Sequence, residues 1–395
     1  MIFTRTRVSM KKKIFHIIPS LRSGGAERQL VEVVRGTSGD RFSHRVCAFS
    51  ESDFFSAPIK QAGQEVIELG VGGKRGWFKA ARKINSLIAG DPPDIIHSWL
   101  FDANIAARLV KLRHRKIPLV TSLQAPDYDP TVIRAGNWPP AKIEMLRWMD
   151  KSLAMLTKPH FAACSEFVAG SFRRELGIPL ARMSVIYNSV DPSALTCGAE
   201  EPAAIRGSLG IAKEDFVYLN IGRLDPQKDH STLLRAFHLS LAATPNAHLV
   251  LIGEGALKNS LADLAASLNI EDRVHLLGKR KDIGACLEMA DAYVFPSLFE
   301  GLPLALLEAM AKGLPCIASD IEPHREVIEN DISGLLVTPA SAAELADTMI
   351  RIYNDVELRK RLGNEALTKV KDQFYSEVLM PKWEELYEKI SENPH

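Results

Sequence analysis

The sequence predicts two α/β domains, each a doubly wound parallel β-sheet with helices on both faces. Short apolar runs rich in β-branched residues alternate with longer stretches of helical periodicity, a pattern typical of buried parallel strands in βαβ units. The chain of 395 residues is long enough for two domains of ordinary size. A segment rich in Pro, Ala, Gly and Ser, at 188–215, separates the runs into two groups and reads as a linker.

The predicted strands follow one another in a regular order. The first group of runs lies at 13–21, 44–50, 65–71, 94–100, 118–123, 160–165 and 183–188. The second group lies at 216–222, 248–253, 273–278, 292–297, 315–319 and 334–339. A final helix is predicted at 374–390. Because such sheets bind ligands at the carboxyl ends of their strands, site residues are expected in the loops that follow these runs.

Composition narrows the class of protein. Apolar residues make up 46% and charged residues 25%, which is typical of a soluble globular protein. The five cysteines are scattered without a C-x-x-C pair, which argues against a disulfide framework or a zinc site and fits a reducing compartment. No apolar run approaches the ~18 residues of a membrane span, and the basic start of the chain reads as a first strand and not a signal peptide. We therefore expect a cytoplasmic protein.

Charge is distributed unevenly along the chain. Residues 1–190 hold 29 Lys and Arg against 16 Asp and Glu, a net charge of +13, while the remainder carries −12. A basic half indicates attraction to an anionic partner. Nucleic acid, an anionic membrane surface and a phosphate-bearing acceptor stay open, as does a purely solubilising role.

Residues 299–313, FEGLPLALLEAMAKG, predict a loop and a buried helix that carries two carboxylates. Pro303 fits the first turn of the helix and Gly313 its end. The helix is apolar on nearly all sides and should be buried, yet the segment keeps Glu300 and Glu308. A buried carboxylate is costly unless it is hydrogen-bonded or paired. The two acids therefore indicate either a polar ligand or pairing within the protein.

The geometry of this predicted helix favours a nucleotide-sugar as the ligand. Glu308 lies ~7 Å along the axis from Pro303, at about 1.5 Å per residue. A diphosphate at the helix N-terminus would leave an attached ribose beside Glu308, and Glu300 would face the group beyond the phosphates. The backbone N–H groups expected near the phosphates belong to Gly301, Leu302 and Leu304.

A second loop brings two cations to the same edge of the predicted sheet. In NIGRLDPQKD, at 220–229, Arg223 and Lys228 follow the first strand of the second domain. They are suited to neutralise a diphosphate, Arg bidentately and Lys as a point charge. The alternative is a solvated loop with two incidental cations. Gly253 and Gly255, at another strand-to-helix turn, either bring backbone near a ligand or serve packing alone.

Two features of the first domain are candidates for the same site. In SGGAERQL, at 23–30, Gly24 and Gly25 permit a tight turn before a helix whose N–H groups favour an anion, although an ordinary strand-to-helix turn explains them too. His97 is predicted at the carboxyl end of a strand, where it would hydrogen-bond a sugar hydroxyl. The alternative for His97 is a satisfied core histidine.

Two basic stretches, at 73–84 and 104–118, suggest a surface that contacts membranes. The second predicts an amphipathic helix on which Arg108, Lys111 and Arg115 share a polar face away from its apolar side. The first adds adjacent Trp and Phe residues. A solvated basic face is the alternative.

In this order along the chain, the segments SGGAER, VIYNSVD, IGRLDPQKD, LIGEG, FPSLFEGLPLALLEAMAKGLPCIASD and ENDISGLLVTP resemble those of the retaining glycosyltransferases of family four. The resemblance implies the GT-B architecture, in which two Rossmann-like domains face each other across a cleft and the C-terminal helix crosses back to the N-terminal domain. It implies an acceptor-side domain at 1–190, a donor-side domain at 191–372 and a crossing helix at 373–395.

The resemblance also implies roles for individual residues. It implies that Arg223 and Lys228 bind the donor diphosphate, that Glu308 binds the ribose, and that Glu300 lies near the donor sugar. It also implies that Gly24 and Gly25 form the glycine loop that faces the donor phosphates and the acceptor. His97 matches a histidine at the edge of the active site in the first domain. The implied catalytic residues are Glu300, Arg223, Lys228 and His97. Gln124 stands where some members have a further histidine. Family members generally need no metal, so neither a metal nor another cofactor is expected.

The expected function is a retaining transfer of a sugar from a nucleoside-diphosphate sugar, by expectation a UDP-sugar, to a glycan or lipid-linked acceptor in surface polysaccharide biosynthesis. Peripheral contact with the inner face of the cytoplasmic membrane is expected, and no nucleic-acid partner. A nucleotide-sugar epimerase of the same architecture and a non-catalytic sugar-nucleotide-binding protein are the alternatives. The base is not fixed, although GKRKDI at 278–283 is expected near it.

Overall fold

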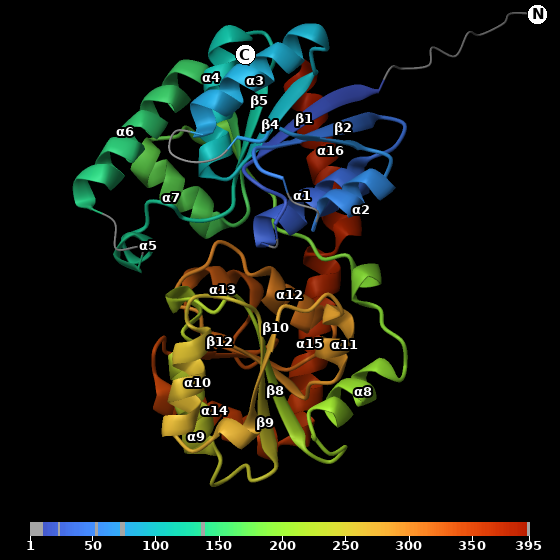
Figure 1. The fold of residues 1–395 in the computed structure, drawn as a ribbon, viewed down its shortest axis with the longest axis vertical. Coiled ribbons are helices and arrows are strands. Elements are labelled where there is room, and N and C mark those ends of the chain that lie inside the picture. The colour runs from blue at the N-terminus through green and yellow to red at the C-terminus, as the bar shows by residue number, and fades with distance from the viewer. Residues whose placement is uncertain (1–10, 23, 52–53, 72–75, 136–138, 393–395) are drawn as a thin grey trace, which may run out of the picture. The chain divides into compact units, whose positions relative to one another are not determined.

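The structure is a computed structural model that describes residues 11–22, 24–51, 54–71, 76–135 and 139–392 (Figure 1). The chain folds into two compact units. The first takes the described residues of Met1–Tyr128, Trp138–Asn188 and Ser376–His395, and the second those of Asp129–Asn137 and Ser189–Tyr375. The C-terminal segment thus joins the unit in which the chain begins.

In the described part of the first unit, a parallel sheet has seven strands in the order β3-β2-β1-β4-β5-β6-β7. The strands are β1 Lys12–Ile18, β2 Phe42–Ala48, β3 Glu65–Glu68, β4 Ile95–Trp99, β5 Leu119–Leu123, β6 His160–Ala163 and β7 Met183–Val185. The helices are α1 Gly25–Thr37, α2 Ser56–Gln61, α3 Gly76–Gly90, α4 Phe101–Arg113, α6 Pro140–Thr157, α7 Glu166–Leu176 and α16 Ser376–Glu392, with a 3-10 turn η1 at Leu180–Arg182.

The described part of the second unit holds a parallel sheet of six strands in the order β10-β9-β8-β11-β12-β13. The strands are β8 Phe216–Ile221, β9 Ala247–Ile252, β10 Val274–Gly278, β11 Ala292–Phe295, β12 Cys316–Ser319 and β13 Leu335–Val337. The helices are α5 Pro130–Ala135, α8 Glu201–Ser208, α9 His230–Ser240, α10 Lys258–Ser267, α11 Ile283–Glu288, α12 Leu304–Ala311, α13 Glu322–Val327, α14 Ala342–Asn354 and α15 Val356–Gln373, with 3-10 turns η2 Pro192–Leu195, η3 Pro226–Lys228 and η4 Glu271–Arg273. Each predicted apolar run coincides with a strand, so the predicted fold class is confirmed.

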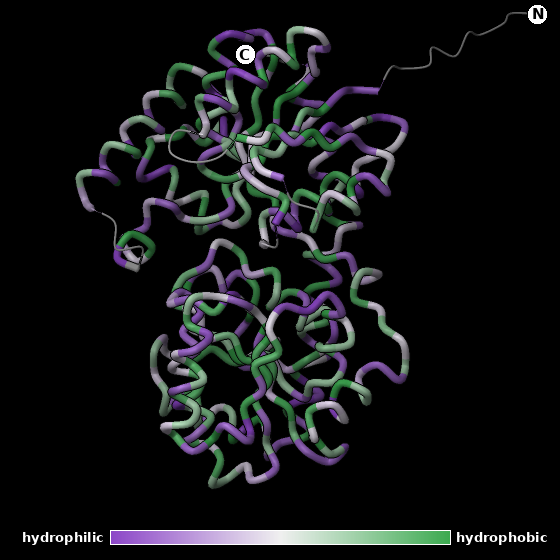
Figure 2. Tube along the Cα trace, in the orientation of Figure 1, coloured by the Kyte–Doolittle hydropathy of each residue, from purple (hydrophilic) through white to green (hydrophobic). Residues whose placement is uncertain are grey.

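Both faces of each sheet are buried because each strand alternates its side chains between two helical layers. In β1, Ile14 packs in the cluster formed with α1 and α16, while the next residue, Phe15, packs in the cluster under α3 and α4. Figure 2 shows hydrophobic residues gathered along the central strands of both units. This two-sided burial explains why the strands read as continuous apolar runs instead of alternating ones.

Helix α16 completes the core of the first unit, as the predicted crossing-back helix should. Trp383, Leu386 and Tyr387 are buried against residues of β1, β2 and β4. In the second unit, the segment just after residue 188 lies beside the segment just before α16. The Val190 N–H donates to the Phe374 carbonyl at 2.9 Å, and Val190 forms a parallel β-bridge with Tyr375.

The predicted basic face of the helix at 104–118 is wrong for Arg108 and Lys111, whereas Arg115 is exposed and lies beyond the end of α4. Arg108 is buried and forms an ion pair with Asp150 of α6, and Lys111 is buried and donates to the backbone carbonyls of Arg115 and Ile117 at 2.7 and 2.8 Å. The physical reason is that α4 lies between α3 and α6 and has no broad solvent-facing side. Among the described helices, none combines the length and apolar character needed to cross a bilayer.

Candidate active site

The candidate site lies where the strand order of the second sheet reverses. The chain runs outward from β8 through β9 to β10, then returns to β11 on the other side of β8. At such a switch point the loops after the two central strands diverge and leave a crevice at their carboxyl ends. Residues 222–229 follow β8 and residues 296–303 follow β11, so the two predicted motifs lie at the same switch point.

Glycines fix the path of the loop that carries Arg223. A Cβ added at Gly253 would lie 1.8 Å from the Gly222 carbonyl oxygen, and one at Gly255 would lie 2.3 Å from the Leu224 carbonyl oxygen. Gly253 also has a φ of +151°, which L-residues rarely adopt. The glycines of LIGEG therefore serve close backbone packing, and that packing positions the loop after β8.

Gln227 joins the two loops of the site. Its backbone carbonyl accepts the Leu298 N–H at 2.8 Å, and its side-chain Nε2 donates to the Phe299 carbonyl at 2.8 Å. Its Oε1 accepts from the Arg223 guanidinium at 3.2 Å. Gln227 and Phe299 are 72 positions apart in sequence, so these contacts join two distant loops into one structural unit.

Lys228 and Glu300 form a nearly buried ion pair. Lys228 Nζ lies 2.5 Å from Glu300 Oε1, and the side chains are only 13% and 9% exposed. The ammonium also lies 4.6 Å from the ring centre of Phe295, the last residue of β11. An ammonium over an aromatic face is stabilised by the ring electrons. The structure therefore brings these two predicted site residues together, and Glu300 holds the charged end of Lys228 in place.

Arg223 differs from Lys228 in its exposure. Its side chain is 67% exposed and contacts Gln227 and, at 3.2 Å, the carboxylate of Asp225. A guanidinium carries five N–H donors, so these contacts leave it capacity for a further anion.

Helix α12 is buried as predicted, and Glu308 lies within it. Counted as whole residues, Glu308 is 3% exposed and Glu300 7%. Burial raises the pKa of Tyr293 in β11 well above its ordinary value, and the negative charges of Glu308 and Glu300 act in the same direction. Both acids are thus within electrostatic reach of one buried phenol. The helix begins after Pro303, and the N–H groups of its first turn have no acceptor within the helix.

His324 is a polar residue at this edge that the sequence did not single out. Its Nδ1–H donates to the Ser319 carbonyl at 2.8 Å, and burial lowers its pKa to about 4, so the ring is neutral near pH 7. Its Nε2 and the buried hydroxyls of Ser297 and Ser319 have no hydrogen-bond partner within the described protein. A single histidine in a short helix gives no periodic or motif signal, which explains why it was missed.

The remaining predicted residues belong to the first unit. Gly25 is the first residue of α1 and Gly24 precedes it with extended backbone. A Cβ at Gly24 would lie 2.3 Å from Glu27 Oε2, because the Glu27 carboxylate folds back over the start of the helix. A carboxylate is favoured there by the helix dipole.

His97 lies in the middle of β4 and not at its carboxyl end, so its predicted position is corrected. It is fully buried, with Nδ1 2.9 Å from the Tyr387 hydroxyl and Nε2 2.8 Å from Ser122 Oγ. Both ring nitrogens are engaged within the core, which favours the core-histidine interpretation. Gln124 directly follows β5, as expected.

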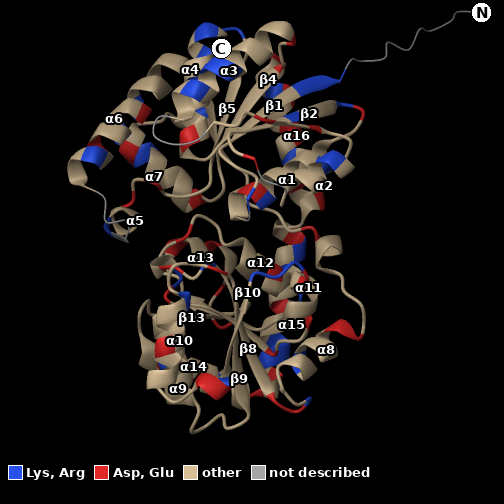
Figure 3. Ribbon diagram, viewed as in Figure 1, with Lys and Arg blue, Asp and Glu red and all other residues tan. Residues whose placement is uncertain are grey.

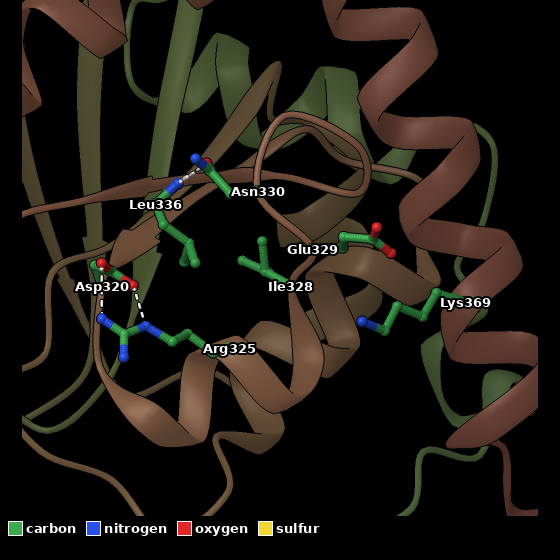
Figure 4. Close-up of a pocket in the computed structure, with 7 residues that line it drawn as sticks. All are labelled: Asp320, Arg325, Ile328, Glu329, Asn330, Leu336 and Lys369. Carbon is green, nitrogen blue, oxygen red and sulfur yellow. Dashed lines mark hydrogen bonds and ion pairs between the residues drawn. The ribbon is translucent and has the colours of Figure 1, made fainter.

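A separate hollow of ≈ 510 Å³ lies at the β13 edge of the second sheet (Figure 4). Its charged side chains are engaged with one another: Arg325 donates twice to Asp320, at 2.6 and 2.9 Å. Burial lowers the pKa of Lys369, and Glu329 opposes that shift. Because this hollow is away from the switch point, we do not assign the site to it. No group of three or more metal-binding side chains occurs among the described residues.

Comparison with known proteins identifies the family to which the chain belongs. The model named Glycosyltransferase Family 4 matches residues 23–194, and the model named Glycosyl transferases group 1 matches residues 202–369. The chain belongs to these family 4, group 1 glycosyltransferases, which have the GT-B fold.

Two curated relatives illustrate the range of the family. A UDP-Gal:alpha-D-GlcNAc-diphosphoundecaprenol alpha-1,3-galactosyltransferase of Escherichia coli is 32% identical over 185 residues, covering 46% of this chain and 48% of the relative. An N-acetyl-alpha-D-glucosaminyl L-malate synthase of Bacillus anthracis is 27% identical over 309 residues, covering 78% and 77%. The chain spans about half the length of the first curated relatives it matches.

Solved structures share the fold. Anabaena HepE in complex with UDP-glucose superposes with a TM-score of 0.82 at 22% identity, over 95% of this chain and 99% of that one. At this identity the likeness concerns the fold alone.

Proposed function

We propose that this glycosyltransferase moves a sugar from a UDP-sugar to a glycan or lipid-linked acceptor in surface polysaccharide biosynthesis, with retention of the anomeric configuration. The observation that carries the proposal is the convergence of Arg223, Lys228, Glu300 and the start of α12 on the switch point of the second sheet. Cations, a helix N-terminus and buried acids suit a ligand with a diphosphate between two polyhydroxylated groups.

In the proposed complex, the diphosphate contacts Arg223, Lys228 and the N–H groups near the start of α12. The exposed Arg223 guanidinium binds phosphate oxygens bidentately, whereas Lys228, held by Glu300, supplies a fixed charge. The N–H groups proposed to take part are those of Gly301, Leu302 and Leu304. Glu308 accepts the ribose hydroxyls, and Glu300 faces the donor sugar.

Catalysis then comes from stabilising the departing nucleoside diphosphate. As the bond between the anomeric carbon and the phosphate oxygen lengthens, negative charge grows on that oxygen, next to groups already arranged to stabilise it. The acceptor oxygen enters on the same face, and its proton passes to the leaving phosphate. No side chain need become a covalent nucleophile, and the two cations do the work for which other enzymes use a metal ion, so activity is proposed to persist with a chelator.

The names of relatives support the choice of donor and acceptor. The E. coli relative is named for a UDP-Gal donor and a diphosphoundecaprenol acceptor, and a Campylobacter jejuni relative is named for a diphospho-undecaprenol acceptor. Anabaena HepE was crystallised with UDP and with UDP-glucose. The B. anthracis relative is named for L-malate, so a small hydroxy acid belongs in any acceptor screen.

The test is a donor screen followed by product analysis. UDP-, GDP- and ADP-sugars are compared by thermal shift, and the stabilising donor is incubated with undecaprenyl-diphosphate-linked sugars and with L-malate. We expect acceptor-dependent release of UDP and an NMR spectrum in which the product keeps the donor's anomeric configuration.

Other outcomes of this experiment would replace the proposal. An isomerised donor without acceptor would identify an epimerase, and donor binding without turnover would identify a non-catalytic binding protein. An inverted product would overturn the retaining mechanism. Lys228→Ala should abolish transfer, while Lys360→Ala, at an exposed lysine of α15 paired with Glu357, is the matched control and should not.

A further inference from the structure

Helix α6 of the first unit presents an apolar stripe to solvent. Met145, Trp148, Met155 and Leu156, here called the α6 stripe, are 59%, 70%, 63% and 69% exposed. At 3.6 residues per turn, these positions fall on one side of the helix. Isolated exposed apolar residues are ordinary, but four large ones on the same side of one helix indicate an interaction surface.

The opposite side of α6 is fixed by charge, which explains why the stripe faces outward. Asp150 is 2% exposed, pairs with the buried Arg108 of α4 and accepts from the Tyr128 hydroxyl at 2.8 Å. Arg147 binds Glu175 of α7 at 2.5 Å. Rolling the helix to bury the stripe would break a buried ion pair, which is strongly unfavourable. These contacts therefore set which side of α6 faces inward, and the exposure of the stripe is built into the fold.

Basic residues accompany the stripe. Lys151 is exposed on α6, Lys158 follows the end of the helix, and Arg173 and Arg174 are exposed on the neighbouring α7. The acid near the stripe, Glu144, is engaged by Arg147 at 2.5 Å. Figure 3 shows basic positions on α6 and on the helices beside it. The residues up to 190, which include α6, carry a net charge of +13.

Helix α3 adds to the same layer of helices, since α3 and α6 both pack on α4. Its Phe78 is 52% exposed and stacks on Trp77 with ring centres 4.1 Å apart. Exposed Lys79 and Arg82 lie on the same helix. Two helices of one layer thus each combine exposed aromatic and basic side chains.

We propose that the α6 stripe docks the first unit on the surface of an anionic lipid bilayer. Trp148 and its apolar neighbours enter the boundary between head groups and acyl chains, where tryptophan is favoured, and the nearby lysines and arginines meet lipid phosphates. An exposed apolar helix side with exposed lysines on and beside the same helix fits an anionic lipid surface. This inference deepens the proposed function, since a lipid-linked acceptor would lie at such a surface, but it is carried by α6 and not by the donor site.

The test is co-flotation of the full-length protein with vesicles of phosphatidylglycerol and phosphatidylethanolamine, and with vesicles of phosphatidylcholine alone. We expect the wild type to float with the anionic vesicles and binding to weaken as salt rises. Trp148→Ser combined with Met155→Ser should lower the partition coefficient at least tenfold. Leu239→Ser, at a leucine of α9 that is 54% exposed, is the matched control and should bind like the wild type.

Three results would overturn the proposal: no flotation of the wild type, equal flotation of the double variant, or a wild-type dimer in sedimentation velocity that the double variant converts to monomer. The last would identify a second copy of the chain as the occupant. Thermal melting shows whether the variant is folded. Donor turnover with a soluble acceptor should be unchanged in the variant, so failure of docking and failure of the proposed function are distinguishable.

Discussion

Replacing Glu300 by glutamine separates the stability of the loops at 222–229 and 296–303 from their proposed chemistry. The substitution preserves shape but removes the charge that pairs with Lys228 at 2.5 Å, in a site where both side chains are nearly buried. Removing one partner of a buried pair costs about 3–5 kcal/mol, because the other charge loses its compensation. Since some solvent reaches this pair, we expect the lower end, about 3 kcal/mol. For a domain of this size that corresponds to a fall in Tm of roughly 6–12 °C.

The double variant Lys228→Met with Glu300→Gln is the informative partner of this experiment. It removes the stranded ammonium, so most of the lost stability should return in denaturant unfolding. Transfer activity should not return, because Lys228 is proposed to stabilise the leaving diphosphate. If Glu300→Gln melted like the wild type, the pair would not be the structural contact described. If the double variant regained transfer, the catalytic role of Lys228 would be refuted.

Three further outcomes are expected. Gly255→Ala places a Cβ 2.3 Å from the Leu224 carbonyl oxygen and should cost about 1–3 kcal/mol in denaturant unfolding, whereas Gly207→Ala, with open space around it, should not destabilise. Burial lowers the pKa of His44 to about 4, so between about pH 6.5 and pH 4 the unfolded chain binds a proton that the folded protein excludes. On this account the free energy of unfolding should fall by about 2 kcal/mol from about pH 7 to about pH 5. The fall should be smaller in the His44→Gln variant, which lacks this group. Glu308→Gln should raise the KM for donor about tenfold or more, because a hydrogen bond to the ribose is weakened. In that variant, a donor with 2′-deoxyribose should show little further increase in KM. If the two changes raised KM independently, so that their effects multiplied, the ribose contact would be excluded.

The acid prediction concerns a core in which several imidazoles are kept neutral. His16, His44 and His97 lie on adjacent strands, with His16 Nε2 2.9 Å from His44 Nδ1. Burial lowers the pKa of His16 and His97 well below the ordinary value. All three histidines lower the free energy of unfolding as pH falls below about 6.5. The free energy of unfolding should therefore change more steeply with pH than His44 alone would produce.

The sequence alone determined the strands, their parallel arrangement and the loops that carry Arg223 and Glu300. A strand buried on both faces requires a continuous apolar run, and that requirement is visible without knowing its neighbours. The position of Arg223 and Glu300 follows in the same way, because each lies in the loop after such a run. Residues 299–313 also showed, without a structure, that a buried apolar segment carries two carboxylates that need polar partners.

Only the tertiary structure decided what each polar side chain meets. Arg108 reads as a surface cation until α6 brings Asp150 against it, and His97 reads as a strand-end ligand until α16 supplies Tyr387. The α6 stripe was hidden for the same reason: periodicity tells which residues share a side of a helix, not which side turns inward. Which side turns inward depends on contacts with residues distant in sequence, because a charged side chain is stable in the interior only when such a residue pairs with it.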